Sequence, residues 1–276
     1  MQRTIGCPYF RKAFGWCIPI GGLGGLIGLG GGEFRLPVLM YAIGFDAKSA
    51  VPLNLAVSLI TLAFAMASRS RVVSLGALGA HLPEIVGLAA GGMISAFYGA
   101  RLVHVLSTRR LVQLIACLLA GLGSLLLLEA VYPFQHSELV PPSPAFHLVA
   151  GVAIGLVSSI LGVAGGELLI PILIFLFGAD IKTAGSASIL ISLLIVTIGL
   201  WRYWQMKAIP EGRGVERITL AMSVGSIIGA ILGGLAVAYA PVGFLKVLLG
   251  GILLVTAFKT MGRHRPNGRN ALGDDR

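Results

Sequence analysis

The sequence predicts an all-α polytopic membrane protein made of two inverted-topology repeats, and two observations support this fold class. The first is composition: 56% of the 276 residues are hydrophobic and only 12% are charged, whereas a soluble domain carries about 25% charged residues. The second is a duplicated segment that begins at Gly30 and again at Ala164. Together they indicate two related halves that cross a lipid bilayer several times.

Long uncharged stretches recur along the chain, and most reach the roughly 20 apolar residues that a membrane-spanning helix needs. The last of them is too long for one span, so we expect Ala240 and Pro241 to mark a tight turn within it. The stretches are 14–32, 49–68, 111–128, 148–166, 183–201 and 218–245.

The net charge of +10 does not indicate a nucleic-acid partner, because the basic residues lie between apolar runs and in the C-terminal tail. That placement is typical of the cytoplasmic ends of membrane helices. The basic N-terminus resembles a secretory signal, but no A-x-A-like cleavage site follows, so we expect it to be retained. Cys7, Cys17 and Cys117 have no metal-type spacing, and we expect neither a cofactor nor a metal.

The duplicated segment repeats at an offset of 134 residues. Between residues 31–50 and 165–184, nine of twenty positions are identical, and they include charged and helix-breaking residues. The matched pairs include Glu33 with Glu167 and Pro37 with Pro171. We therefore expect an N-terminal half at 1–132, a polar periplasmic linker at 133–144, a C-terminal half at 145–265 and a cytoplasmic tail at 266–276.

Each half is predicted to contain a broken helical hairpin followed by three transmembrane helices. The short apolar pieces after the glycines, 36–45 and 168–179, would reach about 18 Å as helices, well short of a hydrocarbon core of roughly 30 Å. The hairpin would therefore dip into the membrane and return to the same face. The predicted spans are 49–68, 84–103 and 110–129 in the first half and 183–201, 217–239 and 242–259 in the second.

Charge placement favours an odd number of crossings per half. With the N-terminus inside, the basic segments 101–110, 202–217 and the tail are all cytoplasmic, while 69–83 and the acidic segment 129–146 lie outside. The halves would then be inverted with both termini cytoplasmic, an arrangement common in secondary transporters.

The two glycine-rich breaks are the first candidate substrate site. Glycines allow a close backbone approach, and a helix that starts after a break would direct its N–H groups at an anion. The alternative is small-residue helix packing, which Gly225, Gly229 and Gly233 also suggest by their spacing of four. The break residues are Gly30, Gly31, Gly32 and Glu33 in the first copy and Ala164, Gly165, Gly166 and Glu167 in the second.

Glu33 and Glu167 are the candidates for proton coupling, because a carboxyl group at membrane depth is a functional candidate by default. The alternative is that both side chains brace the hairpins. Arg35 has no counterpart in the second copy and could pair with Glu33 or meet substrate charge.

Polar residues on the helix after each break are further candidates for substrate binding. Asn54 aligns with Ser188 and Ser58 with Ser192, and the spacing of four places each pair on one helix face. Ser186 lies nearby. Interhelical hydrogen bonds are the alternative role. Asp46 and Asp180 precede apolar runs and are expected to cap helices.

The doubled segments resemble the TauE/SafE family of sulfite and organosulfonate exporters. The resemblance is carried by GLGGGEFRLP at 28–37 and GVAGGELLIP at 162–171, with the trailing Gly-x-Asp-x-Lys-x-Ala. It implies a multi-pass permease of a bacterial inner membrane that moves sulfite, sulfoacetate or related anions, with the glycine-rich segments at Gly30–Gly32 and Gly165–Gly166.

The sequence thus predicts a secondary transporter, and not an enzyme, that exports or imports a small sulfur-containing oxyanion. Its partners would be the anion and the lipid bilayer, and the oligomeric state, monomer or homodimer, stays open. A passive anion channel and a permease for another small organic anion are the alternatives.

Overall fold

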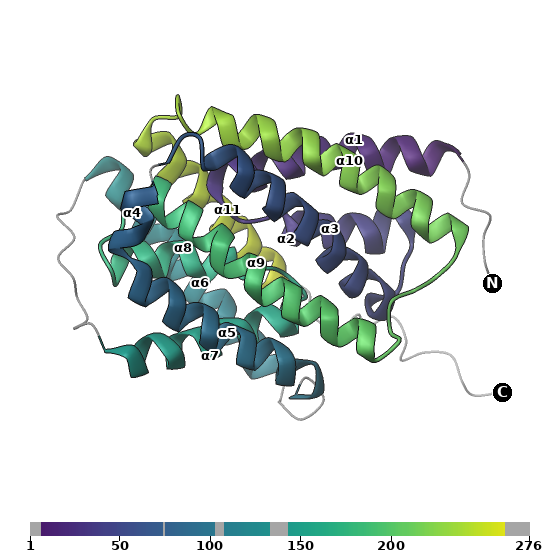
Figure 1. Ribbon diagram of the computed structural model, residues 1–276, viewed down its shortest axis with the longest axis horizontal. Helices are drawn as coiled ribbons and strands as arrows, with labels where there is room; N and C mark the ends of the chain where they lie inside the picture. Colours follow the sequence, from purple (N-terminus) through teal and green to yellow (C-terminus); the bar gives the residue numbers. More distant parts are fainter. Residues whose placement is uncertain (1–6, 74, 103–107, 133–142, 263–276) are drawn as a thin grey trace.

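The computed structural model describes residues 7–73, 75–102, 108–132 and 143–262, and all regular elements within them are helices (Figure 1). Most of the predicted linker and the predicted tail at 266–276 lie outside the described residues. In chain order the elements are α1 (Cys7–Ile27), α2 (Gly32–Pro37), the π-helix η1 (Val38–Ile43), α3 (Ala47–Arg69), α4 (Leu75–Ala80), α5 (Leu82–Leu102), α6 (Thr108–Val131), α7 (Pro144–Leu161), α8 (Gly166–Phe175), α9 (Ile181–Gln205), α10 (Arg213–Ala236) and α11 (Val242–Gly262).

The order of elements repeats at the offset found in the sequence. The helices α1, α2 with η1, α3, α5 and α6 correspond to α7, α8, α9, α10 and α11, whereas α4 has no helical counterpart among the described residues. The predicted long helices are present at the expected places, and the expected turn at Ala240 and Pro241 separates α10 from α11. By length and hydropathy, three helices can cross a membrane when only the fully described residues are counted, namely α3 from Lys48, α9 and α10. On that count the apolar parts of the other helices are shorter.

Two close helix pairs tie the halves together. α1 packs along α10 and α5 packs along α7, side by side at opposite edges of the bundle in Figure 1. A Cβ atom on Gly229 would lie 2.1 Å from the Ile18 carbonyl oxygen, and one on Gly91 would lie 2.1 Å from that of Leu148. Only glycine permits this approach, so the packing role predicted for the spaced glycines is confirmed at these contacts.

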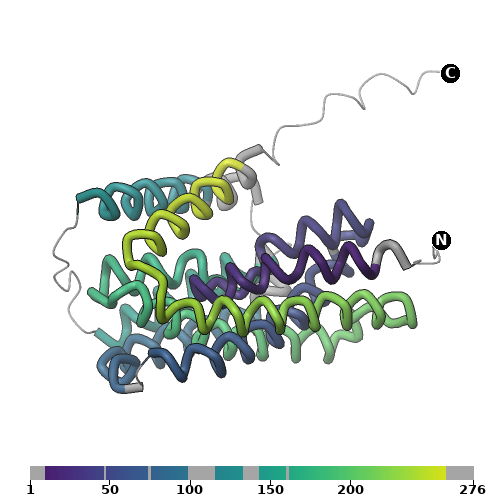
Figure 2. The backbone as a smooth tube through the Cα atoms, turned by 90° about the horizontal axis from the view of Figure 1, so that it is seen from above, coloured from purple at the N-terminus to yellow at the C-terminus, as the bar shows by residue number. Residues whose placement is uncertain are grey.

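The corresponding helices α3 and α9 run antiparallel. Arg69 at the end of α3 bonds Ser186 near the start of α9, while Val51 near the start of α3 lines one cavity with Tyr203 near the end of α9. The pair α6 and α11, which stands apart from the main bundle in Figure 2, is antiparallel as well. There Glu129 near the end of α6 forms an ion pair with Lys246 near the start of α11.

By contrast, α1 and α3 run in the same direction. Cys17 of α1 lies in one apolar cluster with Ala50 and Leu53 of α3, and the carbonyls of Gly25 and Leu26 at the end of α1 accept hydrogen bonds from Arg69 at the end of α3. The chain between these helices must therefore return along the length of α1. α2 and η1 form this returning arm, in which the helix starts at Gly32, four residues earlier than predicted.

Candidate functional site

The two glycine-rich breaks meet in the middle of the molecule. A Cβ atom on Gly166 would lie 2.9 Å from the Leu29 Cα atom, and one on Gly30 would lie 3.5 Å from the Ala164 Cβ atom. Asn54 joins the two breaks, because its side-chain amide donates to the Gly32 carbonyl at 3.1 Å and to the Gly162 carbonyl at 2.9 Å. The structure thus brings the two copies together from sequence positions 134 residues apart.

Glycine at two of these positions is required by the backbone. Gly31 and Gly165 precede α2 and α8 with φ angles of 72° and 82°, in the left-handed region that side chains rarely adopt. Neither residue has a side chain to cap the helix that follows. Because α8 begins at the crossing of the breaks, its first N–H groups lie next to the other copy.

Arg35 is fully buried and braces the first break. Its guanidinium donates to Ser58 Oγ at 2.9 Å, to Thr61 Oγ1 at 3.1 Å and to the Gly30 carbonyl at 3.2 Å. A longer contact of 3.5 Å reaches Asn54 Oδ1. These neutral acceptors hold the arginine against α3, so the guanidinium ties the break to that helix.

The serines of α9 brace the breaks in a simpler way. Ser188 donates to the Gly28 carbonyl at 3.2 Å and Ser192 donates to the Ala164 carbonyl at 3.0 Å. Ser186 accepts from Arg69. These bonds favour the interhelical role for the hydroxyl groups, and their role in substrate binding stays a prediction.

Glu33 and Glu167 sit in the first turns of α2 and α8, directly after the two breaks. Their Oε1 atoms are buried and have no hydrogen-bond partner among the described residues. Glu167 as a whole is 3% exposed. Because a buried carboxyl oxygen without a partner is costly in a folded protein, these atoms are the strongest sign of chemistry at the crossing.

The sequence did not single out Thr61 and Arg69. Thr61 lies on the same face of α3 as Asn54 and Ser58, at spacings of three to four residues that could have revealed it. Arg69 was predicted to belong to an outer loop, and this is wrong for its side chain, which is 1% exposed inside the bundle. Its position corresponds to Tyr203 in the second half. This difference between the two copies is the feature of the sequence that could have drawn attention to Arg69.

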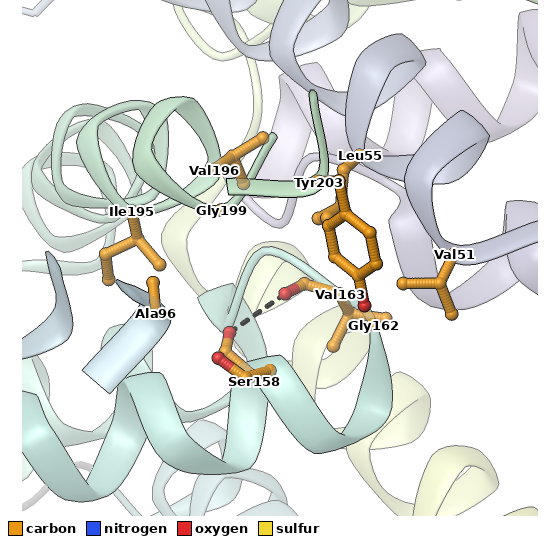
Figure 3. Close-up of a pocket in the computed structure, with 11 residues that line it drawn as sticks. Val51, Leu55, Ala96, Ser158, Gly162, Val163, Ile195, Val196, Gly199 and Tyr203 are labelled. Atoms are coloured by element: carbon orange, nitrogen blue, oxygen red, sulfur yellow. Dashed lines mark hydrogen bonds between the residues drawn. The ribbon is translucent and has the colours of Figure 1, made fainter. Parts of the chain in front are cut away.

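A small cavity of about 30 Å³, room for one or two water molecules, lies beside the second break (Figure 3). The Tyr203 hydroxyl points into it toward Gly162 and Val163, and Ser158 below them donates to the Val163 carbonyl at 2.9 Å. Other parts of the wall come from Val51 and Leu55 of α3. The cavity therefore lies between the second break and the end of the molecule where α3 begins and α9 ends.

The two aspartates that precede α9 and α3 differ in how they cap these helices. Asp180 caps α9 as predicted, accepting from the backbone N–H groups of Lys182 and Thr183. Asp46 takes the corresponding position before α3, but its side chain makes no cap hydrogen bond to the backbone. Within the described part of the chain, no group of three or more His, Cys, Asp or Glu side chains could hold a metal ion.

Comparisons with known proteins agree with this plan of two halves. The family model described as sulfite exporter TauE/SafE matches residues 5–126 and 144–274. A probable membrane transporter protein of Haemophilus influenzae is 27% identical over 250 residues, which cover 86% of this chain and 92% of that protein. The probable membrane transporter protein y4hK of Sinorhizobium fredii is 29% identical over 152 residues, covering 51% of this chain and 59% of that protein. No solved structure matches.

Proposed function

This chain belongs to the sulfite exporter TauE/SafE family of multi-pass membrane transporters, and from that premise we propose that it is a secondary transporter of a small sulfur-containing oxyanion. Sulfite or an organosulfonate is the proposed cargo, and export is the proposed direction. The family and the crossing of the two breaks support the proposal.

The observation that carries the site is the meeting of the two Gly-Gly-Glu segments. Glycine backbone and helix N-termini from both halves converge where Asn54 binds Gly32 and Gly162. Such backbone donors suit an oxyanion. We place the substrate here, near the bilayer midplane, in contact with the residues from Gly30 to Glu33 and from Ala164 to Glu167.

We further propose that the halves 1–132 and 145–265 are inverted in the membrane. The antiparallel pairs α3 with α9 and α6 with α11 support this orientation, since each pair joins corresponding helices. The parallel course of α1 and α3 supports a hairpin that returns to its own side. With the basic segment 202–217 inside, both termini are cytoplasmic in a bacterial inner membrane.

Proton coupling through Glu33 and Glu167 is part of the same proposal. A carboxyl group that binds a proton in one conformation and releases it in another can link proton movement to transport. The buried, unpartnered Oε1 atoms of both residues favour this role.

Uptake into proteoliposomes with and without a proton gradient tests the function. The probes are sulfite, sulfoacetate, taurine, sulfate and a small carboxylate. We expect saturable, gradient-driven movement of a sulfur oxyanion, loss of the gradient dependence in Glu33→Gln and Glu167→Gln, and no change in the control Glu216→Gln, whose side chain is exposed.

The alternatives give different results in the same assay. Conductance that does not saturate and ignores the gradient would identify a passive anion channel. Uptake of the carboxylate alone would identify a permease for another organic anion. Unchanged proton coupling in both glutamine variants would remove the coupling role.

A further inference from the structure

The two halves differ most at a pair of corresponding positions, Tyr203 and Arg69. The cavity of Figure 3 lies on the Tyr203 side, between the second break and the end of the molecule where α9 ends. The residues that line this cavity have counterparts 134 positions away in the sequence, and these counterparts identify the corresponding place beside the first break. There Val51 corresponds to Gly185, Gly162 to Gly28, and Tyr203 to Arg69.

At that corresponding place the Arg69 side chain fills the space between three helices. Its guanidinium donates to the Gly25 and Leu26 carbonyls of α1 at 3.0 Å each. It also donates to the Lys182 carbonyl at 2.7 Å and to Ser186 Oγ at 2.9 Å, both on α9. Four hydrogen bonds thus tie the end of α3 to the end of α1 and the start of α9.

The absence of a side chain at Gly185 makes room for this contact. A Cβ atom there would lie 2.8 Å from Arg69 Nη2 and 2.3 Å from the Ile27 carbonyl oxygen. Its counterpart Val51 carries a full side chain and lines the cavity instead. The sequence therefore builds a closed contact on one side and a hollow on the other.

A basic groove lies directly beyond Arg69. It is lined by Arg71, Lys182 and Tyr239, among others, and the Lys182 ammonium group donates to the Ala238 carbonyl at 3.4 Å. The Lys182 carbonyl also accepts a hydrogen bond from Arg69, so Lys182 belongs both to the groove and to the closed contact. An anion leaving the crossing of the breaks toward this end would have to pass Arg69 and would reach the groove next.

We propose that Arg69 is the latch of a gate that closes the path between the crossing of the breaks and the groove formed by Arg71 and Lys182. In this arrangement the four hydrogen bonds of Arg69 hold the path closed on the groove side. The proposal rests on the transport function proposed above, and it adds the residue that separates the two states. All four hydrogen-bond partners of the guanidinium are neutral, so an oxyanion can replace them with stronger charge-assisted bonds and release the latch.

Side-specific thiol labelling tests the latch without a substrate. In a chain whose native cysteines are replaced, Ser188→Cys reports on the path behind Arg69, and Ser159→Cys reports on the cavity. A membrane-impermeant maleimide is added to oriented vesicles from one side at a time. With Arg69 intact, we expect Ser159→Cys to react from the Tyr203 side and Ser188→Cys to resist from the Arg69 side.

Arg69→Gln should raise the labelling of Ser188→Cys from the Arg69 side about tenfold, the change in the closed-to-open ratio that follows when the closed state loses roughly 1.4 kcal/mol. Arg217→Gln is the control, an exposed arginine near the start of α10 that lines neither the hydrogen-bonded contact nor the groove, and it should leave labelling unchanged. Arg69→Lys, which keeps the charge but reaches fewer acceptors, should give an intermediate rate.

Ser186→Ala keeps the test decisive if Arg69→Gln does not fold, because it removes one of the four latch bonds and should raise labelling by a smaller factor. Unchanged labelling in a folded Arg69→Gln variant, or an equal rise from both sides, would overturn the latch. The labelling experiment contains no anion, so it is independent of the uptake assay. Failure of sulfite uptake would count against the transport function alone. Active transport together with unchanged labelling would count against the latch alone.

Discussion

The two copies of the glycine-rich segment share nine of twenty residues but have different surroundings. After the first break the chain forms α2 and then the π-helix η1, where Tyr41 is 72% exposed. After the second it forms one continuous helix, α8, nine of whose ten residues are buried. The first break is braced by the charged Arg35 and the second by neutral serine hydroxyls. A duplicated sequence thus supports two unequal arms.

The largest effect is expected where the chain that leads into the first break touches the backbone of α9. Gly28 has a φ angle of 106°, and a Cβ atom there would lie 2.3 Å from the Gly185 carbonyl oxygen. Gly28→Ala should therefore lower the free energy of unfolding by about 3–5 kcal/mol, through left-handed strain and overpacking together. The shift is measured as the thermal unfolding of the purified protein in detergent.

Gly44→Ala is the matched control for this prediction. Gly44 has a φ angle of 92°, but nothing lies within 4 Å of the added Cβ atom. The loss should be only about 1–2 kcal/mol, from backbone strain alone. Equal losses in the two variants would show that the contact between Gly28 and α9 contributes nothing beyond local strain.

The next largest loss of stability is expected on substitution of Arg35, a buried charged residue that has no counterpart in the second copy. Arg35→Leu introduces the residue found at the corresponding position, Leu169. It should cost roughly 2–3 kcal/mol, since the Gly30 carbonyl, Ser58 and Thr61 lose a buried donor while the removal of a buried charge offsets part of the loss.

Transport should fall together with stability in Arg35→Leu, because the first break loses its attachment to α3. Leu169→Met, a change of similar volume in the second copy, should cost less than about 1.5 kcal/mol and should leave transport intact. If Arg35→Leu kept full stability and full transport, the two copies would be braced equivalently and the comparison would fail.

The sequence anticipates the arrangement of helices better than the partners of individual side chains. The duplication and the apolar runs predict the recurring element order, because helix length and hydropathy are local properties. The burial of Arg69 was missed, because a cation at the end of an apolar run usually faces water, and only the crossing of α1, α3 and α9 turns it inward. The sequence also does not predict that η1 is a π-helix. Its counterpart α8 stays α-helical although Pro37 and Pro171 occupy matching positions.

Asn54 tests the link between the copies. Asn54→Ala removes two hydrogen bonds, to the Gly32 and Gly162 carbonyls, and should cost roughly 2 kcal/mol because both acceptors are buried. Ser188→Ala, at the corresponding position, removes one bond to the Gly28 carbonyl and should cost about half as much. Detergent unfolding of the two single variants and the double variant gives the comparison, and a larger loss in Ser188→Ala would reverse the order of the two braces.

The smallest effect is expected at the caps of the two corresponding helices. Asp180→Ala should cost about 1 kcal/mol, because the side chain accepts from the N–H groups of Lys182 and Thr183 at the start of α9. Asp180→Asn keeps an acceptor at the same place and should be nearly neutral. At the start of α3, contacts with the Ser49 side chain and with the Ser49 and Lys48 backbone N–H groups hold the pKa of the Asp46 carboxyl below its ordinary value. These contacts are looser than those of Asp180, since none has the geometry of a cap hydrogen bond. Asp46→Ala should therefore destabilise less than Asp180→Ala. If the two alanine variants unfolded at the same temperature, the inequality of the halves would be confined to the breaks and the latch and would not extend to the helix ends.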